Sequence, residues 1–304
     1  MHLIRNSLLA LLMAGAAHAQ AQKAHETPDR PATDQEELAL AALEGLMAQP
    51  PARALPILKK VLAGSQSTLV KRRALFVLSQ VSGPEASDIL LQTARSTNVE
   101  LRGEAIRSIG IGGDPKSLDA LLDIYKAGDE GIKKEILEAW MISGRKEAVY
   151  QAALNANADE EAAAAIRMLG VMGATDELRK LGENRKASSG LLEALAISGD
   201  LAGLRKIADG TGDHALRVDA VRRIGIISND AARAALQEIY TRTTDGEIRD
   251  AALQGMLIAQ DEKGVLALYR AAKTTDEKRA LLRMLSMMDG DAALEAIDAT
   301  LEKK

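Results

Sequence analysis

Cysteine is absent from this sequence, and aromatic residues and histidines are scarce. The 304-residue chain has one Trp, one Phe, four Tyr and four His, and aromatic residues make up 2% of it. Without cysteine there are no disulfides, no thiol nucleophiles and no thiolate metal sites. Ala, Leu and Ile must therefore fill the core, which suits helices that pack closely in layers.

Long apolar runs and alternating strand patterns are also missing. Beyond residue 19 no run approaches the roughly 18 apolar residues of a membrane-spanning helix. No stretch alternates apolar and polar residues as a half-buried strand does, so the sequence predicts an all-α protein. The formal net charge is −4 and the pI is about 5.7, which, with so few aromatic residues for base stacking, argues against nucleic acid as a partner.

Residues 1–19 are typical of a secretory signal peptide. Arg5 gives the positive charge, a short apolar run follows it, and Ala17 and Ala19 form an A-x-A cleavage site. We expect the mature protein to begin at Gln20, to be periplasmic or secreted, and not to insert into a membrane once the signal is removed. A buried N-terminal helix is the alternative interpretation.

Residues 20–33 separate the signal from the rest of the chain. They carry Pro28 and Pro31 and have little apolar content, which predicts a flexible leader. Everything after them, residues 34–304, is predicted to form a single repeat domain.

The stretch Leu101–Gly131 is the unit from which this domain is built. Apolar residues at helical spacing mark a first helix up to Ile109, and a Gly-Gly-Asp-Pro turn follows it. A second amphipathic helix runs from Leu118 to Tyr125, and Gly128 ends it. Such a hairpin cannot bury both apolar faces alone, so it needs neighbours of the same kind.

Apolar columns appear when this unit is slid along the chain. We call Ile109 the anchor of its unit, and each of nine units has an equivalent anchor, spaced 26–32 residues from the next. The anchors are Leu46, Leu78, Ile109, Trp140, Leu169, Leu195, Ile224, Met256 and Leu285. A branched apolar residue stands three places before all nine, and alanine stands four places before six of them. The columns predict nine hairpins whose first helices bury one face and approach one another closely.

Two polar columns set the register of the first helices. Eleven places before the anchors stand residues that cap helix N-termini by accepting backbone N–H groups: Ser67, Asn98, Asp129, Asn184, Asp213, Asp245 and Thr274. Seven places before the anchors stand Lys71, Arg102, Lys133, Arg217, Arg249 and Lys278. We interpret this column as a structural ladder, and where an Asp precedes the basic residue by four places, the spacing suits a local ion pair. A basic row facing a ligand is the alternative.

The repeat is shortest between the anchors Leu169 and Leu195. The spacing falls to 26 residues there, and the polar, glycine-bounded segment 182–190 follows a short second helix. We interpret this segment either as a shortened repeat with a tight loop or as a hinge between two rigid halves.

The pattern aliphatic–basic–x–x–Ala–aliphatic–x–x–aliphatic, followed by a glycine turn and a second helix, resembles HEAT-like repeats of the short, roughly 30-residue type. Phycobilisome lyases contain repeats of this kind. The pattern is carried best by residues 70–78, 101–109, 216–224 and 248–256. The resemblance implies a right-handed α-solenoid of about nine helical hairpins in an exported bacterial protein, and a role in binding other proteins.

Catalytic motifs are missing from the repeats. Some HEAT-repeat proteins are di-iron hydroxylases that use His-Glu pairs, but the one such pair here is His25-Glu26, in the leader. The repeats contain a single histidine, His214, which we interpret as an exposed loop residue and which cannot build a His-rich metal site. No P-loop, G-x-S-x-G or dinucleotide fingerprint occurs. We therefore expect no catalytic residue, no cofactor and no metal.

These observations favour a non-catalytic, exported scaffold or adaptor with a protein partner. Two alternatives stay open: an envelope-associated enzyme or enzyme subunit with a carboxylate-based site, and a structural spacer. Ligand screening separates the enzyme from the others, and co-purification separates the adaptor from the spacer.

The candidate binding surface lies on the second helices of the second and third units. Places 10, 14 and 17 after the anchor fall outside the apolar stripe, and they hold Asp88, Gln92, Arg95, Asp119, Asp123 and Lys126. The HEAT-like resemblance implies that second helices line the concave side. We therefore expect the acidic edge of this row to attract a basic partner and speed its encounter. An ordinary solvated face is the alternative.

Overall fold

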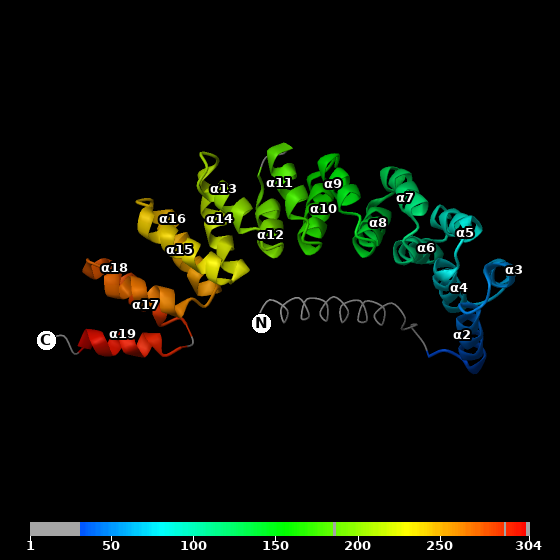
Figure 1. Cartoon of the computed structure of the whole chain (residues 1–304), viewed down its shortest axis with the longest axis horizontal. Helices are drawn as coiled ribbons and strands as arrows, with labels where there is room; N and C mark the ends of the chain where they lie inside the picture. The colour runs from blue at the N-terminus through cyan, green and yellow to red at the C-terminus, as the bar shows by residue number, and fades with distance from the viewer. Residues whose placement is uncertain (1–30, 185–186, 289, 302–304) are drawn as a thin grey trace. The chain divides into compact units, whose positions relative to one another are not determined.

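The computed structural model describes residues 31–184, 187–288 and 290–301. Over these ranges the chain forms eighteen α-helices, α2 to α19, and no strand, so the predicted all-α class is confirmed (Figure 1). No helix in these ranges is long and apolar enough to cross a membrane. The predicted signal peptide, residues 1–19, and the leader up to residue 30 lie outside the described residues.

The chain divides into two compact units between Ala139 and Trp140. The described helices of the first are α2 (Asp34–Leu46), α3 (Pro51–Ala63), α4 (Thr68–Gln80), α5 (Pro84–Ala94), α6 (Val99–Gly112), α7 (Pro115–Ala127) and most of α8 (Glu130–Ile142). The second has α9 (Lys146–Leu154), α10 (Asp159–Val171), α11 (Thr175–Asn184), α12 (Ser189–Ile197), α13 (Leu201–Ala208), α14 (His214–Ile227), α15 (Asp230–Arg242), α16 (Gly246–Ile258), α17 (Glu262–Ala271), α18 (Thr275–Leu285) and α19 (Ala292–Leu301).

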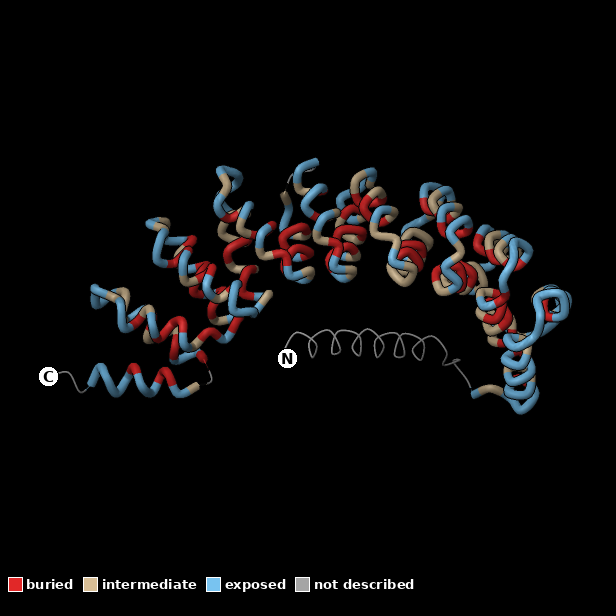
Figure 2. The backbone as a smooth tube through the Cα atoms, viewed as in Figure 1, coloured by how far each residue is buried: buried red, intermediate tan, exposed pale blue. Residues whose placement is uncertain are grey.

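The described helices follow one another in nine successive pairs, and the two helices of a pair contact each other in α4–α5, in α6–α7 and in each pair from α10–α11 to α18–α19. Within a unit, the first helix of one hairpin packs on the first helix of the next, as α4 does on α6 and α14 on α16. The core lies where helices face one another (Figure 2). The anchors from Leu78 to Leu285 are at most 2% exposed, as predicted, whereas Leu46 is only half-buried. The chain is therefore an α-solenoid.

Glycine and alanine bring successive first helices close together. A Cβ atom on Gly225 would lie 2.2 Å from the backbone oxygen of Gly255, and one on Gly170 would lie 2.8 Å from the Cα atom of Ala194. Larger side chains do not fit at these crossings, so the first helices form the more closely spaced layer within each unit. The second helices are spaced more widely.

The turn inside most hairpins has a constant length, and in six of them it contains a left-handed residue. In each hairpin from α4–α5 to α16–α17 the second helix begins six places after the anchor. Four places after the anchor φ is positive at Gly113, Gly144, Gly173, Gly199, Ser228 and Gln260. A left-handed residue ends a helix and turns the chain, and glycine adopts this conformation without a steric penalty. The variation in repeat length therefore lies between hairpins.

The predicted capping column is confirmed for most first helices. The backbone N–H groups of the first turns donate to Asn98, Asp129, Asp213, Asp245 and Thr274. Ser67 stands at the N-cap of α4 but accepts no capping hydrogen bond. Helix α2 begins after Thr33, which forms a capping box with Glu36.

The prediction that Asn184 caps α12 is wrong. Asn184 is the last residue of α11, and the side chain of Ser188 accepts the capping bond from Leu191 N instead. Helix α12 has nine residues, against thirteen in α10, because the repeat is shortened on its N-terminal side. The cap has therefore moved closer to the anchor by about one helical turn.

Arg217 and Arg249 of the basic column contact neighbouring elements, as the predicted structural ladder requires, and not the Asp four places before each of them. Arg217 Nε donates to the carbonyl of Ala208, at 3.2 Å, and so caps the C-terminal end of the preceding helix. Arg249 lies 4.5 Å from the ring centre of Tyr240 and 2.7 Å from Glu277 of the next first helix. The carboxylates of Asp213 and Asp245 instead accept the N-capping hydrogen bonds of their helices. For this reason they form no ion pair with the basic residue four places later.

The segment 182–190 stays within the second unit. The first helices of the two hairpins that it connects, α10 and α12, pack on each other as first helices do elsewhere. Residues 185 and 186 lie outside the described residues, and the hinge stays a prediction.

Candidate protein-binding surface

The six residues of the predicted row are all exposed in the first unit. They are Asp88 and Gln92 on α5, Arg95 just after it, and Asp119, Asp123 and Lys126 on α7. Because α5 packs beside α7, the six residues share one surface, which we call the α5–α7 face.

Burial of one side of each helix directs these side chains outward. Leu118, Leu121 and Tyr125 are buried at helical spacing along α7, and Asp119 and Asp123 fall between them on the opposite side. The apolar period therefore predicts the exposed face without any knowledge of the neighbours.

The next question is which layer of helices lines the concave side of the first unit. A row of paired helices bends towards its more closely spaced layer, and that layer is formed by first helices such as α4 and α6. Packing therefore does not support the expectation, taken from the resemblance, that second helices line the concave side. The α5–α7 face belongs to the more widely spaced layer, where room between helices opens clefts.

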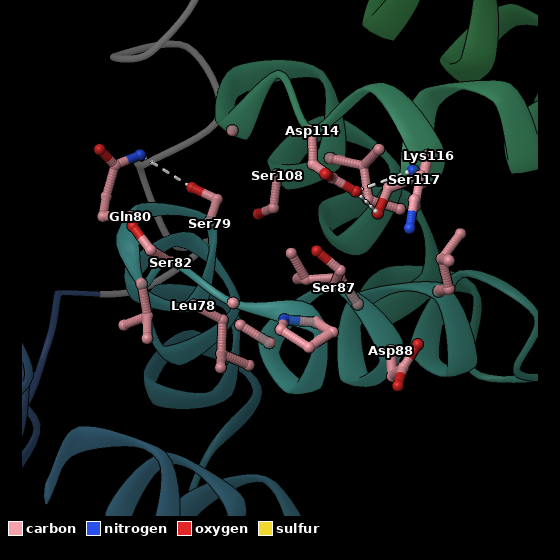
Figure 3. Close-up of a pocket in the computed structure, with 18 of the residues that line it drawn as sticks. Leu78, Ser79, Gln80, Ser82, Ser87, Asp88, Ser108, Asp114, Lys116 and Ser117 are labelled. Atoms are coloured by element: carbon pink, nitrogen blue, oxygen red, sulfur yellow. Dashed lines mark hydrogen bonds between the residues drawn. The ribbon is translucent and has the colours of Figure 1, made fainter. Parts of the chain in front are cut away.

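A cleft of about 710 Å³ opens at the end of the α5–α7 face where both helices begin (Figure 3). Its walls come from the end of α4, the start of α5 and the turn between α6 and α7, and Asp88 belongs to its lining. Five serines line it: Ser79, Ser82, Ser87, Ser108 and Ser117. The cleft is therefore rich in hydroxyl groups that can donate and accept.

Ser108 is the most unusual group in this cleft. It is 0% exposed, and its Oγ has no hydrogen-bond partner among the described residues. Figure 3 shows its side chain in the space that Ser79 and Ser87 also line. A buried hydroxyl without a partner costs about 1–3 kcal/mol, so a bound group that hydrogen-bonds here gains a partner already desolvated.

Asp114 places a negative charge beside the cleft. Its Oδ2 accepts hydrogen bonds from Ser117 Oγ at 2.6 Å and from Ser117 N at 2.9 Å. These two bonds, and a weaker one from the Ser87 hydroxyl, lower the pKa of Asp114 against the opposing effect of burial. The carboxylate is therefore ionised at neutral pH, and Lys116 next to it carries the opposite charge.

A second cleft of about 290 Å³ lies at the other end of the α5–α7 face. Arg95 and Asp123 of the predicted row line it, together with Ser96 and Arg102. The Oγ of Ser96 and the Nε of Arg102 are buried and have no hydrogen-bond partner in the described part of the chain. The α5–α7 face thus runs between two clefts, and each contains desolvated polar atoms.

The two clefts suit hydrogen-bonded recognition. They present hydroxyl groups, negatively charged carboxylates and positively charged side chains. An elongated peptide could form hydrogen bonds with these groups through its backbone and its polar side chains. Over the described ranges, no group of three or more His, Cys, Asp or Glu could hold a metal ion.

The structure brings Asp88, Arg95 and Asp123 to the clefts, whereas Gln92, Asp119 and Lys126 lie on the surface outside them. Sequence reasoning missed the serines. Ser108 stands directly before its anchor, where Val77 and Ala139 stand in the neighbouring hairpins. A hydroxyl in an otherwise buried position was the signal that could have revealed it.

The interpretation of His214 as a loop residue is wrong. His214 is exposed, but it is the first residue of α14, and its Nε2 lies 2.8 Å from Asp245 Oδ2 at the start of α16. This contact, more than the capping bonds from Ile248 and Glu247, lowers the pKa of Asp245. His214 therefore joins two neighbouring repeats.

Comparisons with known proteins agree with this architecture. Residues 55–141 match the sequence model of the HEAT repeat family. The same order of helices continues over the remaining described residues, so the α-solenoid extends beyond the stretch that matches HEAT repeats. No curated protein sequence matches it significantly.

Two solved structures are similar to this chain over most of their length. Human deoxyhypusine hydroxylase, in complex with glycerol, is 15% identical with a TM-score of 0.33, and the match covers 82% of this chain and 98% of that one. The CpcE–CpcF complex of phycocyanin lyase from Nostoc is 20% identical with a TM-score of 0.33, and the match covers 86% and 99% of the chains. At this level of similarity neither function carries over.

Proposed function

We propose that this protein is a non-catalytic scaffold or adaptor, exported from the cytoplasm, whose α5–α7 face binds a basic segment of a partner protein. The observation that supports the proposal most is the pair of clefts at the two ends of the face, with the buried, unpartnered hydroxyl of Ser108 in one of them. A partner that spans the face satisfies these groups and covers the exposed row between them.

Charge indicates the chemistry of the partner. Asp88, Asp119 and Asp123 outnumber Arg95 and Lys126 on the α5–α7 face itself. At the clefts, Lys116 balances Asp114, and Arg102 adds a positive charge. Complementary charge chiefly raises the rate of encounter and the specificity of a protein complex. We therefore expect lysine- or arginine-rich segments to bind faster than neutral ones, with a rate that falls as salt is added.

Reversal of the acidic row tests the proposal. Asp88, Asp119 and Asp123 are replaced together by Lys, and binding of a labelled, lysine-rich peptide and affinity capture from the periplasmic fraction are measured side by side. The control replaces three acidic residues outside the face, Glu160, Asp250 and Asp298, which are also exposed. Glu104 and Glu135 are unsuitable controls, because Glu104 pairs with Arg72 at 3.2 Å and Glu135 is partly buried.

We expect the reversal on the face to weaken peptide binding by at least about tenfold and to lose the captured partner. The control variant should keep both, with helicity and melting temperature equal to those of the wild type. If both variants bind equally well, the α5–α7 face is not the binding surface.

The cleft residue Ser108 provides an independent arm. Ser108→Ala removes the unpartnered hydroxyl without changing the charge, so it should raise thermal stability while weakening the captured complex. A variant that is more stable and binds as well as the wild type would show that the cleft plays no part in recognition.

A further inference from the structure

The second unit carries an exposed apolar row that its own packing does not use. Two places after the anchor of five consecutive first helices stand Val171, Ile197, Ile226 and Ile258, at or next to the last residues of α10, α12, α14 and α16, and Met287, two residues beyond the end of α18. They are 61%, 46%, 42%, 47% and 55% exposed. We call these five residues the ladder. Ile142 holds the same place on α8 and is half-buried.

Isolated exposed aliphatic residues are common on protein surfaces, but a recurrent row of them is not. Twelve large hydrophobic residues of the described part of the chain are exposed, and five of the twelve fall at this one place in the repeat. In the first unit the equivalent place is the polar Gln80 on α4 and the half-buried Ile111 on α6. Among the described residues, large exposed apolar side chains at this place therefore occur in the second unit.

Two of the ladder residues lie next to close crossings between first helices. Gly170 precedes Val171 and packs against Ala194, and Gly225 precedes Ile226 and packs against Gly255. Packed helices are about 8–10 Å apart, so we take about 9 Å as the spacing of the ladder's apolar side chains.

This period matches an extended chain better than a helix. Three residues of polyproline-type backbone span about 9.3 Å, so every third side chain of such a peptide would meet a ladder residue. A helix presents apolar side chains about 5–6 Å apart along one face. On a bound helix, every second apolar side chain would therefore fall between two ladder residues and contact neither.

The flank of the ladder is mainly basic. One helical turn before the ladder residues stand Arg167, Glu193, Arg222, Gln254 and Arg283. Glu193 lies 3.8 Å from Arg223, and Asp219 pairs with both Arg222 and Arg223 one turn further away. Arg167 and Arg283 are exposed at the two ends of the ladder. The excess of arginine favours acidic residues in whatever covers the apolar row.

We propose that the ladder binds an extended, acidic segment of a partner protein with an apolar side chain at every third position. The inference concerns the second unit and does not rest on the α5–α7 face, whose charge preference is the opposite. An adaptor with two such surfaces would hold a basic partner on one unit and an acidic one on the other.

A defined probe tests the proposal on the full mature chain. The probe is a labelled peptide of about 15 residues that repeats Leu-Asp-Pro, long enough to span five ladder residues at about 9.3 Å each. Three comparison probes accompany it: a scrambled peptide of the same composition, an acidic helical peptide with heptad apolar spacing, and vesicles of anionic lipid. Binding is followed by fluorescence anisotropy and by vesicle sedimentation.

We expect the in-register peptide to bind in the micromolar range and the scrambled peptide at least about tenfold more weakly. Ile226→Ser combined with Ile258→Ser should reduce binding at least tenfold, and Arg167→Glu combined with Arg283→Glu should reduce it at low salt. The matched control is Leu38→Ser with Val99→Ser, two exposed apolar residues of the first unit, which should change nothing.

Melting curves of all variants should coincide with that of the wild type, because every replaced side chain is at least partly exposed. Absence of binding, equal binding of the scrambled peptide, or preference for the helical peptide would each overturn the proposal. Vesicle binding that the Ile226 and Ile258 replacements abolish would assign the ladder to a lipid surface instead. The proposal would also be overturned if the peptide still bound the ladder variants but no longer bound the variant in which Asp88, Asp119 and Asp123 are replaced by Lys.

Discussion

Arg179 holds Asp200 across two hairpins. Its Nε lies 2.7 Å from Asp200 Oδ2, and its Nη2 lies 2.5 Å from Oδ1. The carboxylate is almost fully buried and also caps α13 by accepting from Gly203 N at 3.0 Å. A residue of α11 thereby fixes the start of the next second helix.

Removal of the arginine should therefore destabilise the protein. Arg179→Met leaves the buried carboxylate of Asp200 without its cation, and we expect a loss of about 1–3 kcal/mol, because the guanidinium is itself half-exposed. The control is Asp176→Asn, which removes an exposed partner of the same arginine at 3.9 Å and should cost no more than about 0.5 kcal/mol. Urea titrations measure both, and equal midpoints would contradict a structural role for the pair.

The same carboxylate predicts a dependence on pH. Burial alone would raise the pKa of Asp200, but hydrogen bonds from Arg179, Gly203 and Ala202 together lower it. The unfolded pKa is about 3.9, so the stabilisation is complete above that value and is lost as the pH falls through the lower, folded pKa.

The advantage of the wild type over Asp200→Asn should accordingly be largest near pH 7 and shrink in acid. Unfolding of the two proteins at a series of pH values shows it. An advantage that grows on acidification would mean that burial dominates and that the folded pKa is raised.

Close approach of the first helices should make glycine obligatory at their crossings. Gly225→Ala places a Cβ atom 2.2 Å from the Gly255 oxygen, so we expect a loss of about 1–3 kcal/mol from forced separation of α14 and α16. Gly246→Ala, at the start of α16, meets nothing within 4 Å and should be neutral or slightly stabilising. Thermal melting distinguishes the two, and a stable Gly225 variant would refute the crossing.

Replacing a left-handed residue that is not glycine by glycine should stabilise the protein. Gln260 has a φ of 49°, which strains a residue with a side chain by about 1–2 kcal/mol. Gln260→Gly loses the hydrogen bond from Gln260 Nε2 to the Leu257 carbonyl and gains chain entropy in the unfolded state. We expect a net gain of about 0.5–1 kcal/mol in denaturant titrations, whereas a loss would show that the side-chain bond outweighs the strain.

Export predicts a shortened mature protein. Cleavage after Ala19 removes the apolar segment, so protein isolated from its native host should begin at Gln20. Intact-mass measurement decides this, and a chain that retains Met1 in the cytoplasm would contradict both the signal peptide and the proposed location.

Local features of this fold could be predicted from the sequence, and features that depend on stacking could not. The anchors and most first-helix caps follow from spacing along one helix, and Leu169 and Asp213 lie where that spacing places them. The failure at Asn184 arose because a cap follows the length of its own helix rather than its distance from an anchor.

The candidate site shows the same division. Exposure of Asp119 follows from the helical period, but the cleft around Ser108 requires knowledge of how far apart α5 and α7 lie. Contacts such as the one between Arg179 and Asp200, 21 residues apart, likewise depend on the offset between neighbouring hairpins.

The turns within hairpins and the connections between hairpins should differ in how well they tolerate inserted residues, because only the turns have a fixed length. An insertion after Gly113 would separate a left-handed helix end from Asp114, the cap of the next helix, and so disturb both helices at once. The connections between hairpins already differ in length, and the one at residues 209–213 is largely exposed. A fluorophore, tag or cleavage sequence inserted between Thr211 and Gly212 would leave the stacked layers as they are.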